Sequence, residues 1–342
     1  TSRDGKARLV TVVGQAGLGK SRLAWELKKY ADGLTEDVYW HEGQSPAYGE
    51  GVAYWALGEM VRQRCRIGDG EDPVVARAKL TQTLAEYVVS DEERSWVEPA
   101  LAALLGLADA PAGEREELFA AWRTLFERIA EQGTVVLIFE DIHWADESLY
   151  DFIEYLLEWA RSSAILVVAL ARPELLERRS GWGTGQRSAT TAHLEPLPDE
   201  AMQDLLRGLV PGLPVGALEQ VVTRAEGVPL YAVETVRMLL DEGRLVLEGE
   251  RYRLVEETAD LAVPATLQAL ITARLDALPT QERSLVQDAS VLGKTFTRDA
   301  LGAVSQRDRA SVESQSQKLV RKEILAVESS RTSPGSGHLE FV

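Results

Sequence analysis

The stretch GQAGLGKS, residues 14–21, follows a short apolar run and opens a helical pattern. It matches the pattern G-x-x-x-x-G-K-[S/T], in which glycines let successive backbone N–H groups turn toward phosphate oxygens. The preceding run, Arg8–Val13, is rich in β-branched residues, and Leu23, Leu27 and Tyr30 after it fall on one helical face. This order of strand, glycine loop and helix predicts a phosphate-binding loop (P-loop) in an α/β sheet.

The loop supplies most of the candidate nucleotide-binding residues. Lys20 is expected to pair with the β- and γ-phosphates of ATP or ADP, and Ser21 to ligate Mg²⁺. The start of the helix adds the positive end of its dipole. The candidates here are Gly14, Gln15, Ala16, Gly17, Leu18, Gly19, Lys20, Ser21 and Arg22. A glycine-rich turn without a nucleotide is the alternative, and the flanking strand and helix disfavour it.

Two adjacent acids, Glu140 and Asp141, end a second apolar run in IFEDIHWAD, residues 138–146. A P-loop site needs a carboxylate on a neighbouring strand to hold hydrated Mg²⁺. By position, Glu140 is predicted to be the metal ligand and Asp141 the catalytic acid that polarises the attacking water. Because Glu is one methylene longer than Asp, the two roles could also be inverted. A pair of surface acids at a turn is the alternative to both.

Arg172 follows Ala164–Leu170, an apolar run of strand length. Ligands of open α/β sheets bind beyond the carboxyl ends of the strands, and a guanidinium matches phosphate oxygens. We therefore expect Arg172 to contact the γ-phosphate, with a solvated surface arginine as the alternative. Pro229, in GVPL at residues 227–230, could lie against an adenine ring, although the residues alone describe an ordinary turn between helices.

The composition limits the possible functions. The 342 residues are 45% hydrophobic and 27% charged, which predicts a globular protein of two or three domains. A formal net charge of −17 disfavours non-specific binding to nucleic acid or anionic membranes. We see no membrane-spanning run and no secretion leader, so the expected location is the cytoplasm. Cys65 is the only cysteine and the histidines lack metal-ligand spacing, which disfavours a zinc site.

The pattern along the chain changes near residue 197. Residues 1–196 predict a parallel sheet with helices on both faces and a helical insertion at about 52–130. Residues 197–262 predict helices and a short hairpin, and a third unit begins near residue 263. The segment Arg178–Ser188, rich in Gly, Ser and Arg, is predicted to be a mobile loop.

Several stretches together resemble the STAND class of signal-transduction ATPases. They are GQAGLGKSRLA (14–24), YGEGVAYW (48–55), EDIHWADES (140–148), LARPE (170–174), GVPLYAVE (227–234) and VPATLQALITARLDALP (263–279). More closely, the chain is similar to an AAA-type module, related to origin-recognition ATPases. This module accompanies bacterial class III adenylate or guanylate cyclases and large LuxR-type regulators.

The resemblance implies a P-loop ATPase domain at 1–196, a helical lid at 197–262 and a partial winged-helix domain at 263–342. It implies that ATP replaces ADP to open a clamp and permit self-association, and that slow Mg²⁺-dependent hydrolysis resets the clamp. Arg172 then takes a sensor position and Pro229 the adenine contact. His143, Trp144 and Asp146 match a family signature, and we expect them to pack the strand against the following helix.

Compared with this family, the chain has little room before its first strand for an adenine-binding segment, and it stops within the winged helix. We therefore expect a fragment of a larger signalling protein, with weakened adenine contacts. Its expected partners are ATP and other domains or copies of the same protein, whereas nucleic acid is disfavoured and no membrane is expected.

Two other functions remain open. A DNA-binding winged-helix ATPase or transcription regulator would use Lys294–Glu323, which holds seven Lys and Arg residues against four acids, although a solvated helix face explains this excess as well. A nucleotide-binding scaffold that has lost hydrolysis is the other alternative, because the order of Glu140 and Asp141 leaves their roles unsettled.

Overall fold

The computed structural model describes residues 6–33, 37–46, 53–68, 70–109, 114–184, 188–255, 261, 263–264, 266–293, 295–327 and 338–341. Most of the YGEGVAYW stretch, as well as Lys294, therefore lies outside the described residues. The chain divides into two compact units, Thr1–Glu195 and Pro196–Val342. In the described part of both units, no helix is long and apolar enough to cross a bilayer.

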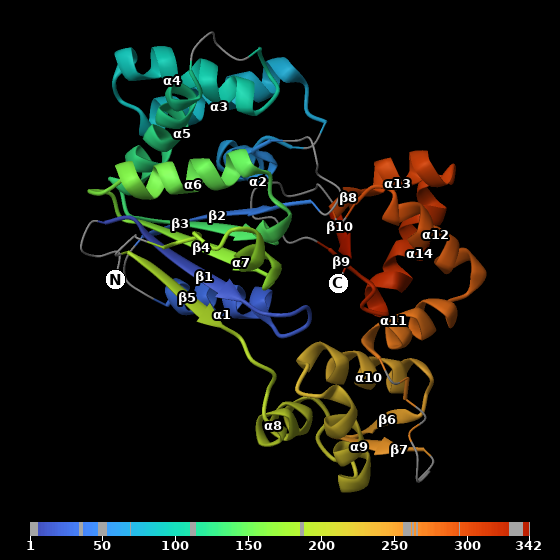
Figure 1. Ribbon diagram of the computed structural model, residues 1–342. Helices are drawn as coiled ribbons and strands as arrows, with labels where there is room; N and C mark the ends of the chain where they lie inside the picture. The colour runs from blue at the N-terminus through green and yellow to red at the C-terminus, as the bar shows by residue number, and fades with distance from the viewer. Residues whose placement is uncertain are drawn as a thin grey trace. The chain divides into compact units, whose positions relative to one another are not determined.

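The first unit is a parallel sheet covered by helices (Figure 1). Its five strands lie in the order β2-β3-β4-β1-β5. This confirms the predicted P-loop type of α/β fold. Its elements are β1 (Arg8–Val13), α1 (Lys20–Asp32), β2 (Val38–Gln44), α2 (Trp55–Cys65), α3 (Pro73–Tyr87), α4 (Asp91–Leu104), α5 (Arg115–Ala130), β3 (Thr134–Glu140), the 3₁₀ turn η2 (Ile142–Trp144), α6 (Glu147–Trp159), β4 (Ile165–Ala171), α7 (Glu174–Arg178) and β5 (Ala189–His193).

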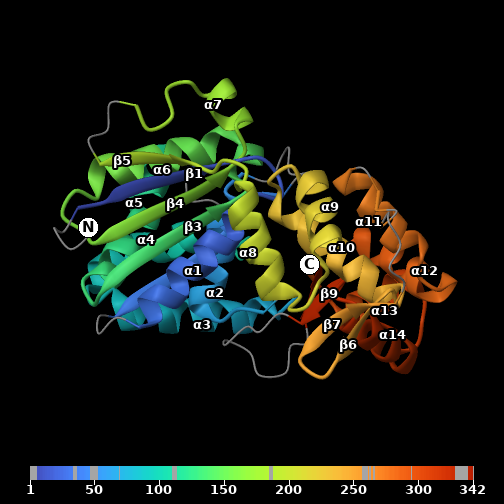
Figure 2. The ribbon, with the colours of Figure 1, turned by 90° about the horizontal axis from the view of Figure 1, so that it is seen from below.

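Successive residues of the central strands point to two separate cores, as the period of two in a strand requires. On one face, Leu137 and Val167 pack with α2–α6. On the other, Ile138 and Val168 pack with α1. Figures 1 and 2 show α6 and α1 on these opposite faces. Burial on both faces explains why the strands are continuously apolar.

The helix α6 begins at a side-chain cap. Asp146 is its N-cap, and the Asp146 carboxylate accepts a hydrogen bond from the backbone N–H of Ser148 at 2.9 Å. The apolar stripe of this helix is buried in the main core; it consists of Leu149, Phe152, Ile153, Leu156 and Leu157. The cap therefore fixes where the chain leaves the turn that follows β3.

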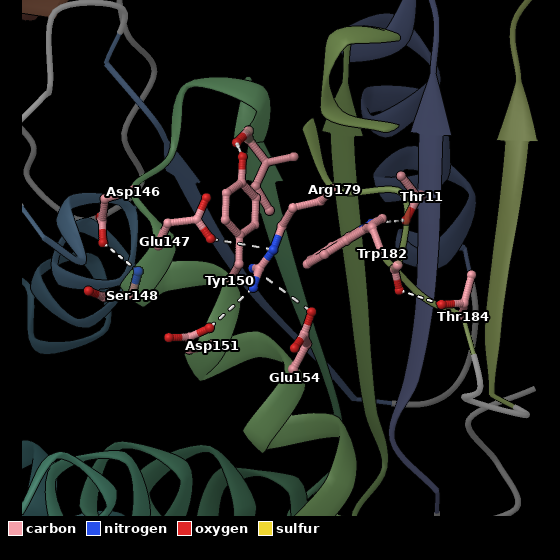
Figure 3. A network of polar contacts seen from close by, with 12 residues as sticks. Thr11, Asp146, Glu147, Ser148, Tyr150, Asp151, Glu154, Arg179, Trp182 and Thr184 are labelled. Atoms are coloured by element: carbon pink, nitrogen blue, oxygen red, sulfur yellow. Dashed lines mark hydrogen bonds and ion pairs between the residues drawn. The ribbon is translucent and has the colours of Figure 1, made fainter. Parts of the chain in front are cut away.

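The prediction of a mobile loop at Arg178–Ser188 is wrong for the part that contains Trp182. The Trp182 side chain is buried, and its indole N–H donates to the hydroxyl of Thr11 in β1 at 2.9 Å (Figure 3). The strand after this segment, β5, was not predicted. Its sequence ATTAH is mostly polar because β5 is the edge strand and most of its side chains are exposed.

Arg179 ties the same segment to α6. Its guanidinium lies 4.8 Å from the centre of the Tyr150 ring. It is also within ion-pair range of three carboxylates of α6 (Figure 3), those of Glu147 (3.5 Å), Asp151 (3.2 Å) and Glu154 (3.9 Å). The chain between β4 and β5 is thus anchored at two points.

The second unit contains helices and two small antiparallel sheets, β6-β7 and β8-β10-β9. The elements are α8 (Asp199–Leu209), α9 (Val215–Ala225), α10 (Pro229–Asp241), β6 (Leu245–Glu248), β7 (Arg251–Leu254), α11 (Leu267–Asp276), α12 (Thr280–Ser290), β8 (Thr295–Thr297), α13 (Arg298–Ser305), α14 (Arg309–Arg321), β9 (Leu325–Val327) and β10 (His338–Phe341).

The second unit has two hydrophobic cores, and α11 contributes to both. Leu270 belongs to the core of α8–α10, whereas Leu275 packs against the core of α12–α14. Between them lies a buried ion pair of Arg274 and Glu234, whose side chains are 7% and 8% exposed. The Arg274 guanidinium also donates to the carbonyl of Lys322 at 2.9 Å. A polar cluster therefore joins the two cores.

Candidate functional site

The glycine loop joins β1 to α1 in the predicted place. Gly17 and Gly19 have positive φ angles of 82° and 97°, which side chains rarely adopt. The ammonium group of Lys20 donates hydrogen bonds to the carbonyls of Gly14 at 2.8 Å and Gln15 at 3.0 Å. Lys20 thus lies across the loop at the start of α1, where free backbone N–H groups favour an anion.

Ser21 and Glu140 meet at the ends of α1 and β3. The hydroxyl of Ser21 donates to Oε2 of Glu140 at 3.0 Å. Mg²⁺ prefers oxygen ligands and is commonly held by one or two protein oxygens together with phosphate and water. A hydroxyl and a carboxylate at this separation therefore fit Mg²⁺. Of the two adjacent acids, the structure places Glu140 against Ser21.

Asp141 turns the chain from β3 into η2, with a φ of 50° that is uncommon outside glycine. Its Oδ2 accepts a hydrogen bond from the side-chain amide of Gln44 at 2.7 Å. Gln44 ends β2 and is paired with Glu140 in the parallel register. Its backbone N–H donates to the carboxylate of Glu59 at 2.9 Å. The two acids therefore face different partners.

The sequence did not single out Gln44. The strand β2 continues past His41 to Gln44. A polar residue at the carboxyl end of a strand next to β3 is the pattern that could have pointed to Gln44. The carboxyl ends of parallel strands meet at one edge of the sheet, so such a residue lies near the acids that follow β3.

Arg172 follows β4 at this same edge. Its guanidinium carbon lies 5.2 Å from the centre of the Trp144 ring, and its backbone N–H donates to Nδ1 of His143 at 3.4 Å. Among the described residues, no carboxylate is in ion-pair range of Arg172 or of Lys20. Two cations that lie close enough to influence each other at one sheet edge, neither of them paired with a carboxylate in the described part of the chain, suit the binding of an anion.

The charged groups of the site influence one another. Burial lowers the pKa of the Lys20 ammonium, while Asp141 raises it and Arg172 lowers it. Burial also lowers the pKa of His143, whereas the negative charge of Asp141 raises it. His143 is therefore neutral near pH 7. Residues from α1, β3, η2 and β4 thus form one electrostatic site.

Two predicted residues lie elsewhere. The guanidinium of Arg22 donates to Glu26 at 2.6 Å and lies 4.5 Å from the centre of the Trp25 ring, so it is engaged on the surface of its own helix. Pro229 is the first residue of α10 in the second unit, and its contact with adenine stays a prediction. The proposed roles of the other site residues likewise await measurement.

Comparison with known proteins agrees with this geometry. Residues 1–168 match the model of the AAA ATPase domain. These residues belong to the AAA ATPase family. The chain therefore carries a nucleotide-binding ATPase module of the kind that the loop and the acidic pair predicted. Members of this family typically use Mg²⁺ with the nucleotide, in agreement with the Ser21 and Glu140 oxygens.

The chain is also similar to longer proteins. A Signal Transduction ATPase with Numerous Domains (STAND) from Pyrococcus horikoshii, which has a tetratricopeptide repeat sensor, matches with a TM-score of 0.51 and 13% identity. The match covers 99% of this chain and 39% of that one, which shows a shared fold. An uncharacterised protein of Rhizobium meliloti (strain 1021) is 22% identical over 315 residues, covering 88% of this chain and 29% of the relative.

The chain therefore spans well under half of either relative. The Orc1 protein of Aeropyrum pernix, in a structure with DNA, matches with a TM-score of 0.40 and 12% identity over 98% of this chain and 83% of that one. This last likeness is too weak to support a conclusion.

Proposed function

We propose that this AAA ATPase module is a nucleotide-dependent switch in a multidomain signalling protein, with slow Mg²⁺-dependent ATP hydrolysis that controls conformation or self-association. The observation that carries this proposal is the convergence of Lys20, the pair of Ser21 and Glu140, and Arg172 at one sheet edge. A lysine, an oxygen pair and an arginine without a carboxylate partner provide what a nucleotide triphosphate requires.

In this proposal the loop and Lys20 bind the β- and γ-phosphates. Ser21 and Glu140 hold Mg²⁺, which neutralises phosphate charge when it is bound. Asp141, oriented by Gln44, accepts a proton from the attacking water or polarises it. Arg172 contacts the γ-phosphate. Because ADP lacks this phosphate, the surroundings of Arg172 differ between the ATP-bound and ADP-bound states. A switch needs such a difference, because a ligand can shift the equilibrium between two conformations only if it binds them with different affinities.

The division of the second unit is part of the same proposal. We infer a helical lid at 197–262 that brings Pro229 to the adenine, and a winged-helix domain at 263–342. The two separate cores, and the three-stranded sheet next to α12–α14, support this division. An attached cyclase or a LuxR-type region elsewhere in the full protein would be the output, as in the family that the sequence resembles.

DNA binding by the proposed winged helix is less well supported. Several of its basic residues are neutralised within the unit. Lys322 pairs with Glu282 at 2.8 Å, and Arg298 with Glu313 at 3.0 Å. An excess of positive charge is what non-specific DNA affinity requires, and these ion pairs reduce it.

Equilibrium binding of Mg·ATP tests the proposal, with the parent protein and Lys20→Ala side by side. We expect Lys20→Ala to weaken binding by roughly 100-fold, since it removes a direct phosphate contact. Lys28→Ala is the matched control, because Lys28 lies on the same helix and forms a surface ion pair with Glu42 at 2.7 Å. Equal affinities of Lys20→Ala and the parent would refute the proposed site.

A further inference from the structure

Trp144 and Arg172 form a pair at the edge of the nucleotide site that the proposed mechanism leaves unexplained. The guanidinium of Arg172 lies over the Trp144 ring, 5.2 Å from its centre. Within the described residues, this ring is the only contact found for the guanidinium, because the hydrogen bond to His143 comes from the Arg172 backbone. The face of the Trp144 ring attracts the guanidinium cation, and the guanidinium N–H groups stay free to donate hydrogen bonds elsewhere.

Trp144 is itself held in place. Its backbone N–H donates to the carbonyl of Asp141 at 3.0 Å, and its ring lies 4.7 Å from that of His143. The Tyr150 hydroxyl donates to the carbonyl of Ile142 at 2.5 Å within the same turn. The η2 turn is therefore a fixed support, and Asp141, the residue between β3 and η2, sets its position.

The carbonyl of His143 provides a further link to the segment after Arg172. It accepts a hydrogen bond from the Arg178 guanidinium at 3.4 Å, and Nδ1 of the same residue accepts the one from the Arg172 backbone. The turn after β3 and the segment after β4 are thus joined at His143, the residue before Trp144. The Arg172 side chain is flexible, and the Trp144 ring already restricts its guanidinium. Arg172 therefore loses less side-chain freedom on binding an anion than an unrestrained arginine would.

We propose that Trp144 is a positioning residue for Arg172, which it holds over its ring so that the guanidinium N–H groups stay available to the γ-phosphate. This inference rests on the proposed function and adds to it a source of ATP-over-ADP discrimination. The effect belongs to the pair: Trp144 acts on the nucleotide only through Arg172.

A double-mutant cycle tests the inference with the ratio of the dissociation constants for Mg·ADP and Mg·ATP as the readout. The set is the parent, Trp144→Leu, Arg172→Ala and the double variant, with thermal melts on each sample. We expect Trp144→Leu to lower the preference for ATP by about five- to tenfold, the size of a partly buried cation–π contact. In the Arg172→Ala background the same change should have no further effect.

Two controls separate positioning from packing. Trp144→Phe keeps a ring face and should retain most of the preference. Trp159→Leu removes a tryptophan that is 59% exposed on α6 and should change nothing. If Trp144→Leu weakened ATP and ADP equally, or if its effect added to that of Arg172→Ala, the residue would only pack and the inference would be overturned.

The outcomes also distinguish this inference from the proposed function. A parent that binds nucleotide no better than Lys20→Ala would refute the site as a whole, and this inference with it. A parent that prefers ATP, together with an unchanged preference in Trp144→Leu, would refute the positioning role alone.

Discussion

Ser21 donates its hydroxyl to Glu140 at 3.0 Å, although 119 residues separate the two along the chain. The hydrogen bond joins the first turn of α1 to the end of β3, and it decides which of the two adjacent acids faces the phosphate-binding loop. The other acid, Asp141, turns toward Gln44. This separation gives the two carboxylates different expected roles, which substitution can tell apart.

Replacing Glu140 by Gln should raise the Mg²⁺ concentration needed for half-maximal hydrolysis and lower the rate by roughly 100-fold, because a neutral amide attracts a divalent cation less than a carboxylate does. Titration of the single-turnover rate with Mg²⁺ measures this change. Glu59→Gln provides a comparison at a carboxylate that contacts β2, not the loop. An unchanged Mg²⁺ requirement in Glu140→Gln would show that the roles of the two acids are inverted.

Replacing Gln44 by Leu should slow hydrolysis by about tenfold while leaving the affinity for ATP nearly unchanged. The substitution removes the amide that donates to Asp141 at 2.7 Å and leaves the carboxylate without its orienting partner. Single-turnover rates and equilibrium binding on the same samples separate the two effects. In the Asp141→Asn background, Gln44→Leu should cost little further rate, and additive losses would contradict the pairing.

The stability of the first unit should fall as the pH is lowered below about 6.5. Burial, followed by the nearby Arg64 guanidinium, lowers the pKa of His41 to about 3 in the folded chain. The unfolded chain then binds more protons than the folded one between the two pKa values, so acid favours unfolding by up to about 1.4 kcal/mol per pH unit.

Denaturant unfolding at a series of pH values measures this slope. A His41→Asn variant should be less stable at neutral pH and show a shallower decline between pH 6.5 and 4. His193, which is exposed on β5, offers the control His193→Asn. Equal slopes for the parent and His41→Asn would assign the acid sensitivity to other groups.

Replacing Arg274 by Met should destabilise the second unit by about 3 kcal/mol, because it leaves the buried carboxylate of Glu234 without this partner. Glu234 retains Arg237 at 2.7 Å, which keeps the expected loss at the lower end of the range for buried pairs. The matched control is Arg253→Met, which breaks a pair with Glu248 whose side chains are more than half exposed. Denaturant unfolding of both variants should show a large loss only for the first.

The sequence predicted the parts of the site that depend on local patterns. The P-loop is one such pattern, since glycine positions and Lys20 are specified within eight residues. The central strands were equally predictable, because burial on both faces makes them continuously apolar.

What the sequence could not predict depends on contacts between distant segments. The end of β2 at Gln44 has no apolar signal, because Gln44 faces Asp141 instead of a core. Trp182 lies in a segment of Gly, Ser and Arg that is typical of a loop, and only the hydroxyl of Thr11 in β1 explains its burial. The polar strand β5 lacks a hydrophobic pattern because it is an edge strand.

The roles of Glu140 and Asp141 also depend on contacts between distant segments. Their order alone left the roles open, since the choice depends on the positive φ of Asp141. That turn directs one acid to Ser21 and the other to Gln44.

We propose that this AAA ATPase module hydrolyses ATP slowly through Asp141. The most direct test is single-turnover hydrolysis of pre-bound Mg·ATP by the parent and by Asp141→Asn, with binding checked in the same samples. The account predicts slow cleavage by the parent, and in Asp141→Asn normal binding with cleavage reduced by at least about 100-fold. A parent that binds ATP and never cleaves it, or an Asp141→Asn variant that cleaves at the parent rate, would contradict the account.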